Sequence, residues 1–357
     1  MWHEDVTKRL ELAIVPPSLT IADALARLDR AGTGVLLLAD DDRVLFGIVT
    51  DGDIRRHILS GESLDVPCAN IATRTPLVAT PETTKAEALH LMDHARDFVL
   101  NHLPVVDADR RIVGLVLRSD LVSTDHAGLS AVIMAGGFGT RLRPLTDTVP
   151  KPMLPVGDRP LLELTVERLR RSGIKRVNVT THYLADAISN HFGDGHAFGV
   201  DMRYVPEDRP LGTAGALRLM EPTDEPLLVL NGDILTTVDF QALLAYHREH
   251  RADVTVGVRK YELQVPYGVV ECDGALVRAL REKPVRTFLV NAGIYLLEPS
   301  VMGFIPEGRR FDMTDLIQSL LDAGRRVASF PIVEYWLDIG RMADYEQAQD
   351  DVKHARL

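Results

Sequence analysis

The chain has 357 residues, more than a typical single hydrophobic core accommodates, and this length predicts two domains. Its composition, 46% hydrophobic and 25% charged, is ordinary for a globular protein, while the net charge of −11 argues against a nucleic-acid-binding or anionic-membrane-binding surface. The N-terminus lacks the apolar core of a signal peptide, and no apolar run has the length of a membrane span, so we expect a cytoplasmic protein.

The two cysteines, Cys68 and Cys272, lie far apart in the sequence and show no metal-ligand spacing. A chain of this length with so few cysteines does not depend on a disulfide framework. We therefore expect both to be buried thiols in a reducing compartment, where an unpaired cysteine packs as a small apolar residue.

The first 127 residues contain an internal repeat, with one copy at 34–59 and the other at 101–122. Each copy has an apolar strand, an Asp-rich turn, a second strand containing glycine, and a helix that begins at an aspartate. Amphipathic helices precede them at 18–32 and 81–95. Since neither copy buries its apolar face alone, the repeat predicts two halves packed against each other.

A polar segment, residues 123–130, reads as a linker and divides the chain into domains at 1–127 and 128–357. Beyond it, strands alternate with helices such as 161–173, a pattern that predicts an α/β sheet with ligands at the carboxyl ends of its strands. Continuous apolar strands favour parallel pairing. The expected strands are 130–135, 176–182, 201–207, 226–233, 253–260 and 291–299.

Three glycines, Gly136, Gly137 and Gly139, follow the first of these strands, and Arg141 and Lys151 come soon after. Glycines at such a place let backbone N–H groups approach a phosphate chain without obstruction by a Cβ atom. The alternative is a tight turn with surface arginines. The loop is neither a P-loop nor a dinucleotide fingerprint, because GK[ST] and G-x-G-x-x-G are both missing.

A longer series of motifs is more specific than this loop. GGFGTRLRPLT and KPMLPV are followed in order by EDRPLGTAGAL, LVLNGD, PYGVV, REKP, NAGIYLLEP and YWLDIGRMADY. From residue 130 to about 349 the chain thus resembles the sugar-1-phosphate nucleotidyltransferases. The resemblance implies a Rossmann-like mixed-sheet domain that transfers a nucleotidyl group from a nucleoside triphosphate (NTP) to a sugar-1-phosphate and releases pyrophosphate.

The resemblance also implies a catalytic set of five residues. Arg141 corresponds to the arginine that grips the triphosphate, and Lys151 to the lysine at the reacting phosphates. Asp233 and Asp338 correspond to the ligands of Mg²⁺, a cation that prefers hard oxygen ligands. Lys283 corresponds to the lysine that holds the sugar phosphate. Outside their motifs, the aspartates could be a turn residue and a hydrogen-bond partner, and the lysine a surface charge.

Two further groups of residues are implied as binding residues. The nucleotide would contact Ala135, Gly136, Gly137, Gly139, Thr140, Gly212, Thr213 and Ala214. The sugar would contact Gly268, Glu282 and Asn291. No residue resembles a covalent nucleophile or an essential general base, which direct displacement by an anionic phosphate does not need.

The identity of the base and the sugar stays open. The form PLGTAGAL resembles the GDP-mannose pyrophosphorylase branch, which favours GTP, while uridylyl-, thymidylyl- and adenylyltransferases are alternatives. Mannose, glucosamine and heptose phosphates are all compatible with the sequence, and the product would serve as a precursor of cell-surface glycans. A non-catalytic nucleotide sensor is the alternative from a different functional class, and the intact catalytic set argues against it.

The repeated segment resembles a pair of CBS domains. In GIVTDGDIRR (47–56), Thr50 corresponds to a residue that contacts phosphate and Asp53 to one that binds ribose hydroxyls. The second copy keeps Asp120 but has Leu117 where Ser or Thr is expected. The resemblance implies one regulatory purine nucleotide per chain, bound mainly by the first copy. The alternative is a module that only assembles a homo-oligomer, either a dimer or a tetramer.

Overall fold

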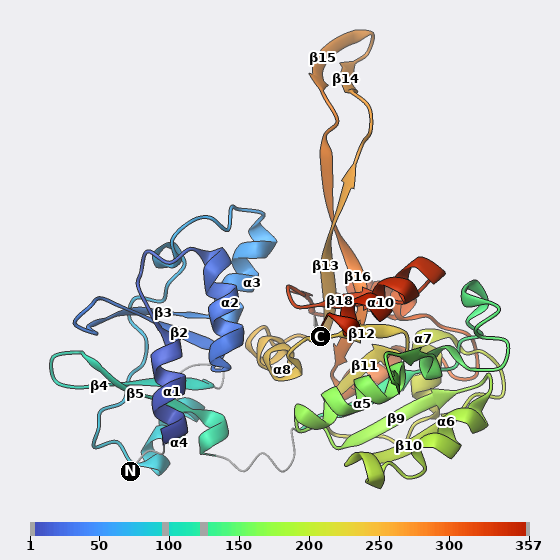
Figure 1. The fold of residues 1–357 in the computed structure, drawn as a ribbon, viewed down its shortest axis with the longest axis horizontal. Coiled ribbons are helices and arrows are strands. Elements are labelled where there is room, and N and C mark those ends of the chain that lie inside the picture. The colour runs from blue at the N-terminus through green and yellow to red at the C-terminus, as the bar shows by residue number, and fades with distance from the viewer. Residues whose placement is uncertain (1–3, 95–99, 122–127, 355–357) are drawn as a thin grey trace. The chain divides into compact units, whose positions relative to one another are not determined.

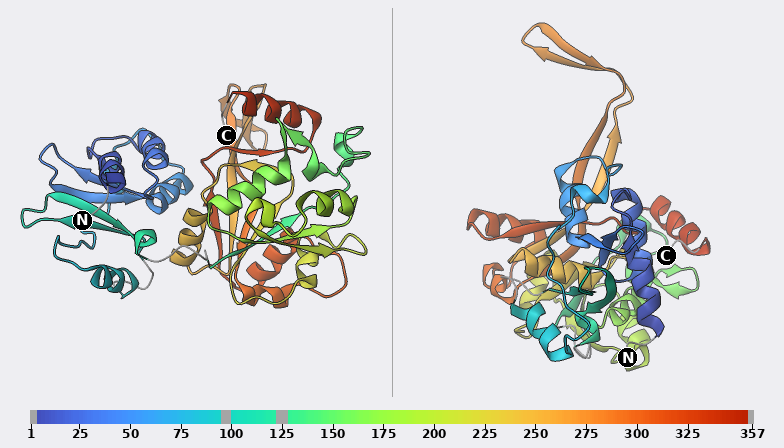
Figure 2. Two further views of the ribbon diagram at one scale, coloured as in Figure 1. Left: turned by 60° about the horizontal axis from the view of Figure 1, so that its bottom comes forward. Right: turned by 90° about the vertical axis from the view of Figure 1, so that its left-hand side faces the viewer.

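The computed structural model describes residues 4–94, 100–121 and 128–354 (Figures 1 and 2). The chain forms two compact units, of which the second comprises residues 129–238 and 253–357. The first unit comprises residues 1–128 together with 239–252, which include helix α8 (Phe240–Glu249). Most of the predicted linker, residues 123–127, lies outside the described residues.

The first unit contains the predicted repeat as two similar sets of elements. In each copy a helix precedes an antiparallel strand pair, β2–β3 in the first and β4–β5 in the second, and β1 adds a parallel strand beside β2. The elements are α1 (Glu4–Ala13), β1 (Ile14–Val15), α2 (Ile21–Ala31), β2 (Val35–Ala39), β3 (Leu45–Thr50), α3 (Asp51–Ser60), α4 (Lys85–His94), β4 (His102–Val106) and β5 (Ile112–Leu117).

The two copies share one buried hydrophobic cluster, as the repeat predicts, and each also has a cluster of its own. Val35 and Leu37 of the first copy lie in the same buried cluster as Ile112 and Leu115 of the second. The two β-turns also pair with each other, because Leu45 N donates to the Arg110 carbonyl at 2.9 Å and Ile112 N donates to the Arg43 carbonyl at 2.9 Å. One face of each strand pair is therefore buried only by the other copy.

The helix that follows the second strand differs between the copies. In the first, Thr50 caps α3 and forms a reciprocal capping box with Asp53. In the second, Leu117 offers no side-chain acceptor, and the described segment contains only a short 3₁₀ turn, Arg118–Asp120. The departure at Leu117 therefore has a local structural counterpart, since an apolar residue cannot satisfy the free N–H groups of a helix start.

The second unit is built around a seven-stranded mixed sheet in the order β10-β9-β6-β11-β16-β13-β17. Strand β16 is antiparallel to both of its neighbours, and the other adjacent strands are parallel. The strands of this sheet are β6 (Ser130–Met134), β9 (Arg176–Thr181), β10 (Asp201–Pro206), β11 (Leu227–Asn231), β13 (Val254–Gln264), β16 (Val285–Leu297) and β17 (Val327–Pro331).

Helices and shorter strands complete the second unit (Figure 1). The short pairs are β7–β8, β12–β18 and β14–β15. These elements are β7 (Pro155–Val156), β8 (Arg159–Pro160), α5 (Leu161–Arg171), α6 (Ala185–Phe192), α7 (Gly212–Gly215), β12 (Ile234–Thr236), β14 (Val269–Asp273), β15 (Leu276–Arg281), α9 (Met313–Asp322), β18 (Trp336–Asp338) and α10 (Met342–Lys353).

The strand order places a topological switch point at the carboxyl ends of β6 and β11, where sheets of this kind form a crevice. The connections from β6 through α5 to β9, and from β9 through α6 to β10, run toward one edge of the sheet. The connection from β10 through α7 to β11 returns past β6 and covers the other face, where its side chains join a buried cluster with α9. Right-handed crossovers on opposite faces leave an open crevice where the direction changes, and ligands bind in such crevices.

A long two-stranded arm projects from the sheet of the second unit (Figure 1). Strands β13 and β16 stay paired as far as Gln264 and Val285, and β14 and β15 form the tip. The sequence predicts that the first of these strands ends at 260 and that the second begins at 291, so the outer arm is not predicted. The expectation that Cys272 is buried is wrong, because Cys272 is exposed on β14, whereas Cys68 is buried as expected. Strand β14 belongs to the arm, outside the core of the second unit, so the Cys272 thiol stays exposed.

Among the described residues, no helix is both long enough and apolar enough to cross a membrane.

The first unit contains a histidine whose titration should affect stability. The His102 ring lies beside Gly34, and burial lowers the pKa of His102 to about 4, with a partial opposing effect from the charge of Asp53. Since this pKa lies below the unfolded value, the contribution to stability is present above about pH 6.5 and is lost as the pH falls toward 4.

We expect the wild type to lose roughly 1–2 kcal/mol more unfolding free energy between pH 7 and pH 5 than the variant His102→Gln. Urea unfolding followed by circular dichroism at the two pH values measures this difference. Equal acid sensitivity of the two proteins would contradict the assignment to His102.

Candidate functional site

The glycine loop leaves the end of β6 and is held close to its neighbours. Ala135 N donates to the Thr180 carbonyl at 3.1 Å, which fixes the start of the loop against β9. A Cβ atom on Gly136 would lie 2.6 Å from Glu207 Oε1. Gly139 has φ +63°, and its carbonyl accepts a 2.8 Å hydrogen bond from Thr146 Oγ1. Gly136 and Gly139 are thus required by close approach and by backbone conformation, respectively.

Strand β11 ends beside this loop and delivers Asp233 to the same crevice. Gly232 N donates to the Met134 carbonyl at 3.0 Å, and a Cβ on Gly232 would lie 2.7 Å from that oxygen. The next residues pair as β12 with β18, in a register that places Ile234 opposite Asp338. Ile339 N also donates to the Asp233 carbonyl at 3.0 Å. Two carboxylates from distant parts of the sequence therefore lie on adjoining segments.

Two cations lie among these carboxylates. Lys151 Nζ donates to Asp233 Oδ2, and this ion pair is largely shielded from solvent. Arg141 Nη1 and Asp338 Oδ1 each lie 3.7 Å from the Cβ position of Gly340, so both groups flank this glycine, and the charge of Arg141 acts on Asp338. The structure thus brings together Arg141, Lys151, Asp233 and Asp338, as the sequence motifs predict.

The electrostatics of the crevice suit a cation. Burial of its carboxyl raises the pKa of Asp338, the charge of Asp233 raises it further, and Lys151 and Arg141 partly oppose these effects. Asp233 Oδ1 is buried without a hydrogen-bond partner among the described residues. An acceptor left in this way favours an added cation or donor.

The carboxylates of Asp233 and Asp338 are too few to enclose a metal ion by themselves. Among the described residues, no group of three or more His, Cys, Asp or Glu side chains could enclose a metal. Two carboxylates with one orphaned oxygen fit Mg²⁺, which typically binds through one or two carboxylates and completes its shell with water and substrate phosphates.

The predicted base-binding segment is tied into the protein by its own backbone. Thr213 N donates to Asp312 Oδ1 at 3.2 Å, and Ala214 N donates to the Phe311 carbonyl at 3.0 Å. Gly212 has φ +80° and packs against the same residues. These bonds occupy N–H groups of Thr213 and Ala214, so a base would have to use other atoms of the segment.

The predicted sugar-binding residues are not all brought to the crevice. Asn291 lies at the base of the arm, where its Oδ1 accepts a 2.9 Å hydrogen bond from Gly293 N. Gly268, Glu282 and Lys283 lie at the joint between the arm and its tip. A Cβ on Gly268 would lie 3.1 Å from Glu282 Oε2, so this pair is in contact. These three residues thus belong to the arm that projects from the sheet (Figure 1).

Glu207 is a site residue that the sequence analysis did not single out. Its side chain is buried at the end of β10, its Oε2 accepts a 2.9 Å hydrogen bond from Leu211 N, and its Oε1 faces Gly136. It thereby connects the glycine loop to the base-binding segment. Glu207 is the first residue of the motif EDRPLGTAGAL and ends a predicted strand, and this position is the feature of the sequence that could have identified it.

In the first unit, the predicted regulatory residues also have a structural role. Thr50 Oγ1 and Thr50 N both donate to Asp53 Oδ2 at 2.8 Å, and Arg56 binds Asp53 Oδ1 at 2.6 Å. Asp120 of the second copy has a weak 3.5 Å contact with Arg9. The capping box accounts for Thr50 and Asp53 whether or not a nucleotide binds.

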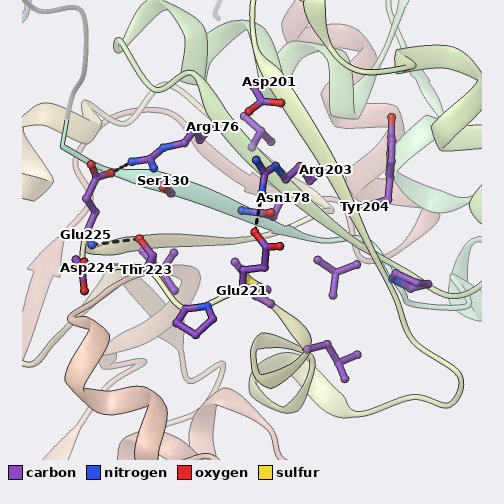
Figure 3. Close-up of a pocket in the computed structure, with 17 residues that line it drawn as sticks. Ser130, Arg176, Asn178, Asp201, Arg203, Tyr204, Glu221, Thr223, Asp224 and Glu225 are labelled. Carbon is purple, nitrogen blue, oxygen red and sulfur yellow. Dashed lines mark hydrogen bonds and ion pairs between the residues drawn. The ribbon is translucent and has the colours of Figure 1, made fainter.

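A separate cavity of about 730 Å³ lies along β10, at the amino ends of β6 and β9 and beside the segment that precedes β11 (Figure 3). Its lining includes the first residues of β6, β9 and β10, whereas the glycine loop follows the last residue of β6. Its arginines are engaged with acids, Arg176 with Glu225 and Arg203 with Glu221. The volume of this cavity does not identify it as the reaction site, because Arg141, Lys151, Asp233 and Asp338 converge in the crevice at the carboxyl ends of β6 and β11.

The comparisons with known proteins agree with this geometry. Residues 130–355 match the nucleotidyl transferase family. The chain belongs to that family. Residues 4–60 and 68–126 match the CBS domain, one match for each copy of the repeat. The transferase domain thus holds the crevice, and the CBS pair precedes it.

The similar curated proteins differ in base and sugar. A UTP–glucose-1-phosphate uridylyltransferase of Synechocystis is 36% identical over 241 residues, which are 62% of this chain and 62% of that protein. A mannose-1-phosphate guanylyltransferase of Mycobacterium tuberculosis is 34% identical over 233 residues, 63% of this chain and 64% of that protein. The match therefore spans somewhat less than two thirds of either relative.

Solved structures show the same fold. HddC of Yersinia pseudotuberculosis aligns with a TM-score of 0.50 and 26% identity, covering 62% of this chain and 99% of that chain. A Bacillus anthracis protein described as a glucose-1-phosphate thymidylyltransferase aligns with a TM-score of 0.51 and 25% identity, covering 62% of this chain and 94% of that chain.

Two glycines of the crevice provide a matched test of its packing. A Cβ on Gly232 would collide with the Met134 carbonyl, whereas a Cβ on Gly137 meets nothing within 4 Å. We expect Gly232→Ala to lose about 1–3 kcal/mol of unfolding free energy, because the clashing atom is backbone and cannot rotate away. Gly137→Ala should unfold at nearly the wild-type urea concentration. Equal stability of the two variants would contradict the described contact between β6 and β11.

Proposed function

We propose that the protein transfers a nucleotidyl group from an NTP to a sugar-1-phosphate, releasing pyrophosphate and forming a nucleotide sugar. The observation that carries the proposal is the convergence of Lys151, Arg141, Asp233 and Asp338 beside a glycine loop at the crevice between β6 and β11. The family and the curated relatives support it, since the relatives named above act on sugar-1-phosphates.

The charges of the site match the needs of this reaction. A sugar-phosphate oxygen would attack the α-phosphorus, and the bond from that phosphorus to the oxygen bridging the α- and β-phosphates would break. Because both reactants are anionic, the protein must reduce their repulsion and hold them in line. Lys151 and Arg141 supply positive charge, and the loop at Gly136–Gly139 supplies backbone N–H groups that can approach a phosphate. The attacking group is already ionised, so no general base is needed.

Asp233 and Asp338 would hold Mg²⁺ when the nucleotide is bound. The ion would supply charge neutralisation and alignment of the phosphates. The chain's contribution is to present Asp338 on β18 and Asp233 just before the paired strand β12, with one buried oxygen of Asp233 available.

Our proposal for the base and the sugar is more specific than membership of the family supports by itself. The segment PLGTAGAL and the guanylyltransferase relatives favour GTP and mannose-1-phosphate, and the product would be a precursor of cell-surface glycans. The uridylyltransferase relative keeps UTP as the leading alternative, followed by thymidylyl and adenylyl transfer.

The decisive assay measures pyrophosphate released from each NTP with a panel of hexose and heptose 1-phosphates in the presence of Mg²⁺. We expect turnover in the wild type and a loss of roughly a hundredfold or more in Asp233→Asn, because charge stabilisation at the reacting phosphates is removed. The matched control is Asp224→Asn, an exposed acid in the lining of the separate cavity, which should keep the wild-type rate.

Absence of turnover with every pair of substrates would overturn the enzymatic function and favour a non-catalytic nucleotide sensor. A near-normal rate in Asp233→Asn would instead show that the reaction does not use the crevice described above.

We further propose that the CBS pair binds one regulatory purine nucleotide, chiefly through Thr50 and Asp53 of the first copy. Its support is the CBS match and the intact first motif, beside a second motif that lacks the capping hydroxyl. The oligomerisation-only role is the alternative.

Calorimetric titration of the full chain with adenine and guanine mononucleotides tests this regulatory site. We expect Asp53→Asn to weaken binding at least about tenfold, because the carboxylate that would accept from two ribose hydroxyls is lost. Asp120→Asn is the control and should have a smaller effect. Binding that neither variant changes would favour the oligomerisation role.

A further inference from the structure

Helix α10 carries a buried carboxylate that the proposed reaction does not use. Asp351 is only 4% exposed. Its Oδ2 accepts a 2.8 Å hydrogen bond from the Tyr335 hydroxyl, and its Oδ1 accepts a 2.9 Å hydrogen bond from Gln347 Nε2. Because taking a carboxylate out of water is costly, a buried acid is weak evidence for stability alone. Its bonds are directional, however, and a buried bonded network of this kind fixes one geometry.

The tyrosine bonded to this carboxylate immediately precedes β18, the strand that ends at Asp338. The backbone of Tyr335 is also bonded to the end of β12. Thr236 Oγ1 donates to the Tyr335 carbonyl at 2.8 Å, and Tyr335 N donates to Thr237 Oγ1 at 3.1 Å. The bond to α10 therefore holds one end of the β12–β18 pair, and the other end of that pair adjoins both Asp233 and Asp338.

The same helix is bonded to the segment that carries Lys151. Tyr345 Oη and Gln349 Nε2 each donate to the Pro155 carbonyl at 2.6 Å, and Gly157 N donates to Gln349 Oε1 at 3.0 Å. Pro155 begins β7, which follows the turn at Lys151 closely in the sequence. Helix α10 thus contacts the segments that carry a cation and a carboxylate of the crevice.

Apolar packing joins these contacts into one unit. A single buried cluster contains Ala348 of α10 and a close sequence neighbour of each of the four charged residues of the crevice. These neighbours are Leu142, Leu154, Leu235 and Ile339. Apolar contacts hold the segments together but are non-directional. The hydrogen bonds from α10 to Tyr335 and Pro155 supply the direction that such packing lacks.

We propose that Asp351 and Tyr335 are positioning residues for the metal site. Their hydrogen bond anchors β18 on α10 and thereby sets the position of Asp338 relative to Asp233. The inference rests on the proposed transferase function, in which these two carboxylates hold Mg²⁺. Since Mg²⁺ demands near-ideal octahedral geometry, a small displacement of one of two protein ligands weakens its binding.

Manganese binding tests this role without relying on turnover. The electron paramagnetic resonance signal of free Mn²⁺ is titrated with the full-length protein and a non-hydrolysable analogue of GTP or UTP. We expect Tyr335→Phe to weaken Mn²⁺ binding about tenfold, the lower end of the effect of residues that orient a metal ligand indirectly. The variant keeps the ring in the apolar cluster and loses only the bond to Asp351.

Three further variants separate positioning from a general loss of structure. Asp351→Asn keeps an oxygen that can accept from Tyr335, so it should bind Mn²⁺ within about threefold of the wild type. Asp350→Asn changes the exposed neighbour on the same helix. Tyr204→Phe removes another tyrosine hydroxyl, which donates to the Gly193 carbonyl at 2.8 Å. Both of these controls should bind Mn²⁺ like the wild type.

Steady-state rates give a second readout. We expect Tyr335→Phe to raise the Mg²⁺ concentration required for half-maximal rate about tenfold and to keep a near-normal kcat at saturating Mg²⁺. Normal Mn²⁺ binding by Tyr335→Phe, or equal weakening in Tyr204→Phe, would overturn the positioning role and leave the transferase function intact.

The wild type itself separates the two proposals. A wild type that binds no Mn²⁺ with either analogue would overturn the metal site and, with it, the role of Asp351 and Tyr335. A wild type that binds Mn²⁺ but turns over no substrate would refute the transferase function alone, because the variants still report on the metal site.

Discussion

The ion pair between Lys151 and Asp233 joins the two segments on which the site depends, the one that follows β6 and the one that follows β11. These strands are parallel neighbours whose connections cover opposite faces of the sheet, so their carboxyl ends open into one crevice. The contact of Gly232 with Met134 brings the strand ends close enough for the pair to form. Removing two charges from water is costly, and this cost is offset only when the two groups stay paired and hydrogen-bonded. The neighbouring residues must therefore keep Lys151 and Asp233 in contact.

That constraint explains why the site concentrates both signs of charge. Asp338 adds a second carboxylate whose pKa is raised, Arg141 adds a second cation, and one oxygen of Asp233 stays without a partner among the described residues. Such an arrangement is prepared for a polyanion accompanied by a divalent cation, since each component finds an opposite charge.

Much of this could be predicted from the sequence, because the relevant signals are local. The glycine loop, the aspartate at the end of LLVLN and the strand–helix alternation each follow from a few adjacent residues, and the repeat is visible by comparison of the chain with itself. The long arm was not predicted because its strands are exposed on both faces, so their sequence lacks the pattern of a strand that packs on a core. Their pairing also joins residues that are distant in the sequence, which no local pattern indicates. The bonds that Thr213 and Ala214 make with Phe311 and Asp312 span almost 100 residues, so no local pattern predicts them.

We propose that a metal-bound triphosphate occupies the crevice between β6 and β11. Paramagnetic broadening by Mn²⁺, added with a non-hydrolysable NTP analogue to the isotope-labelled full chain, locates the ion directly. The account predicts that amide signals of residues 135–141, 231–234 and 338–340 broaden, and that Asp233→Asn abolishes the effect. Broadening that centres on Arg176 and Arg203 in the lining of the separate cavity, or that persists unchanged in Asp233→Asn, would contradict it.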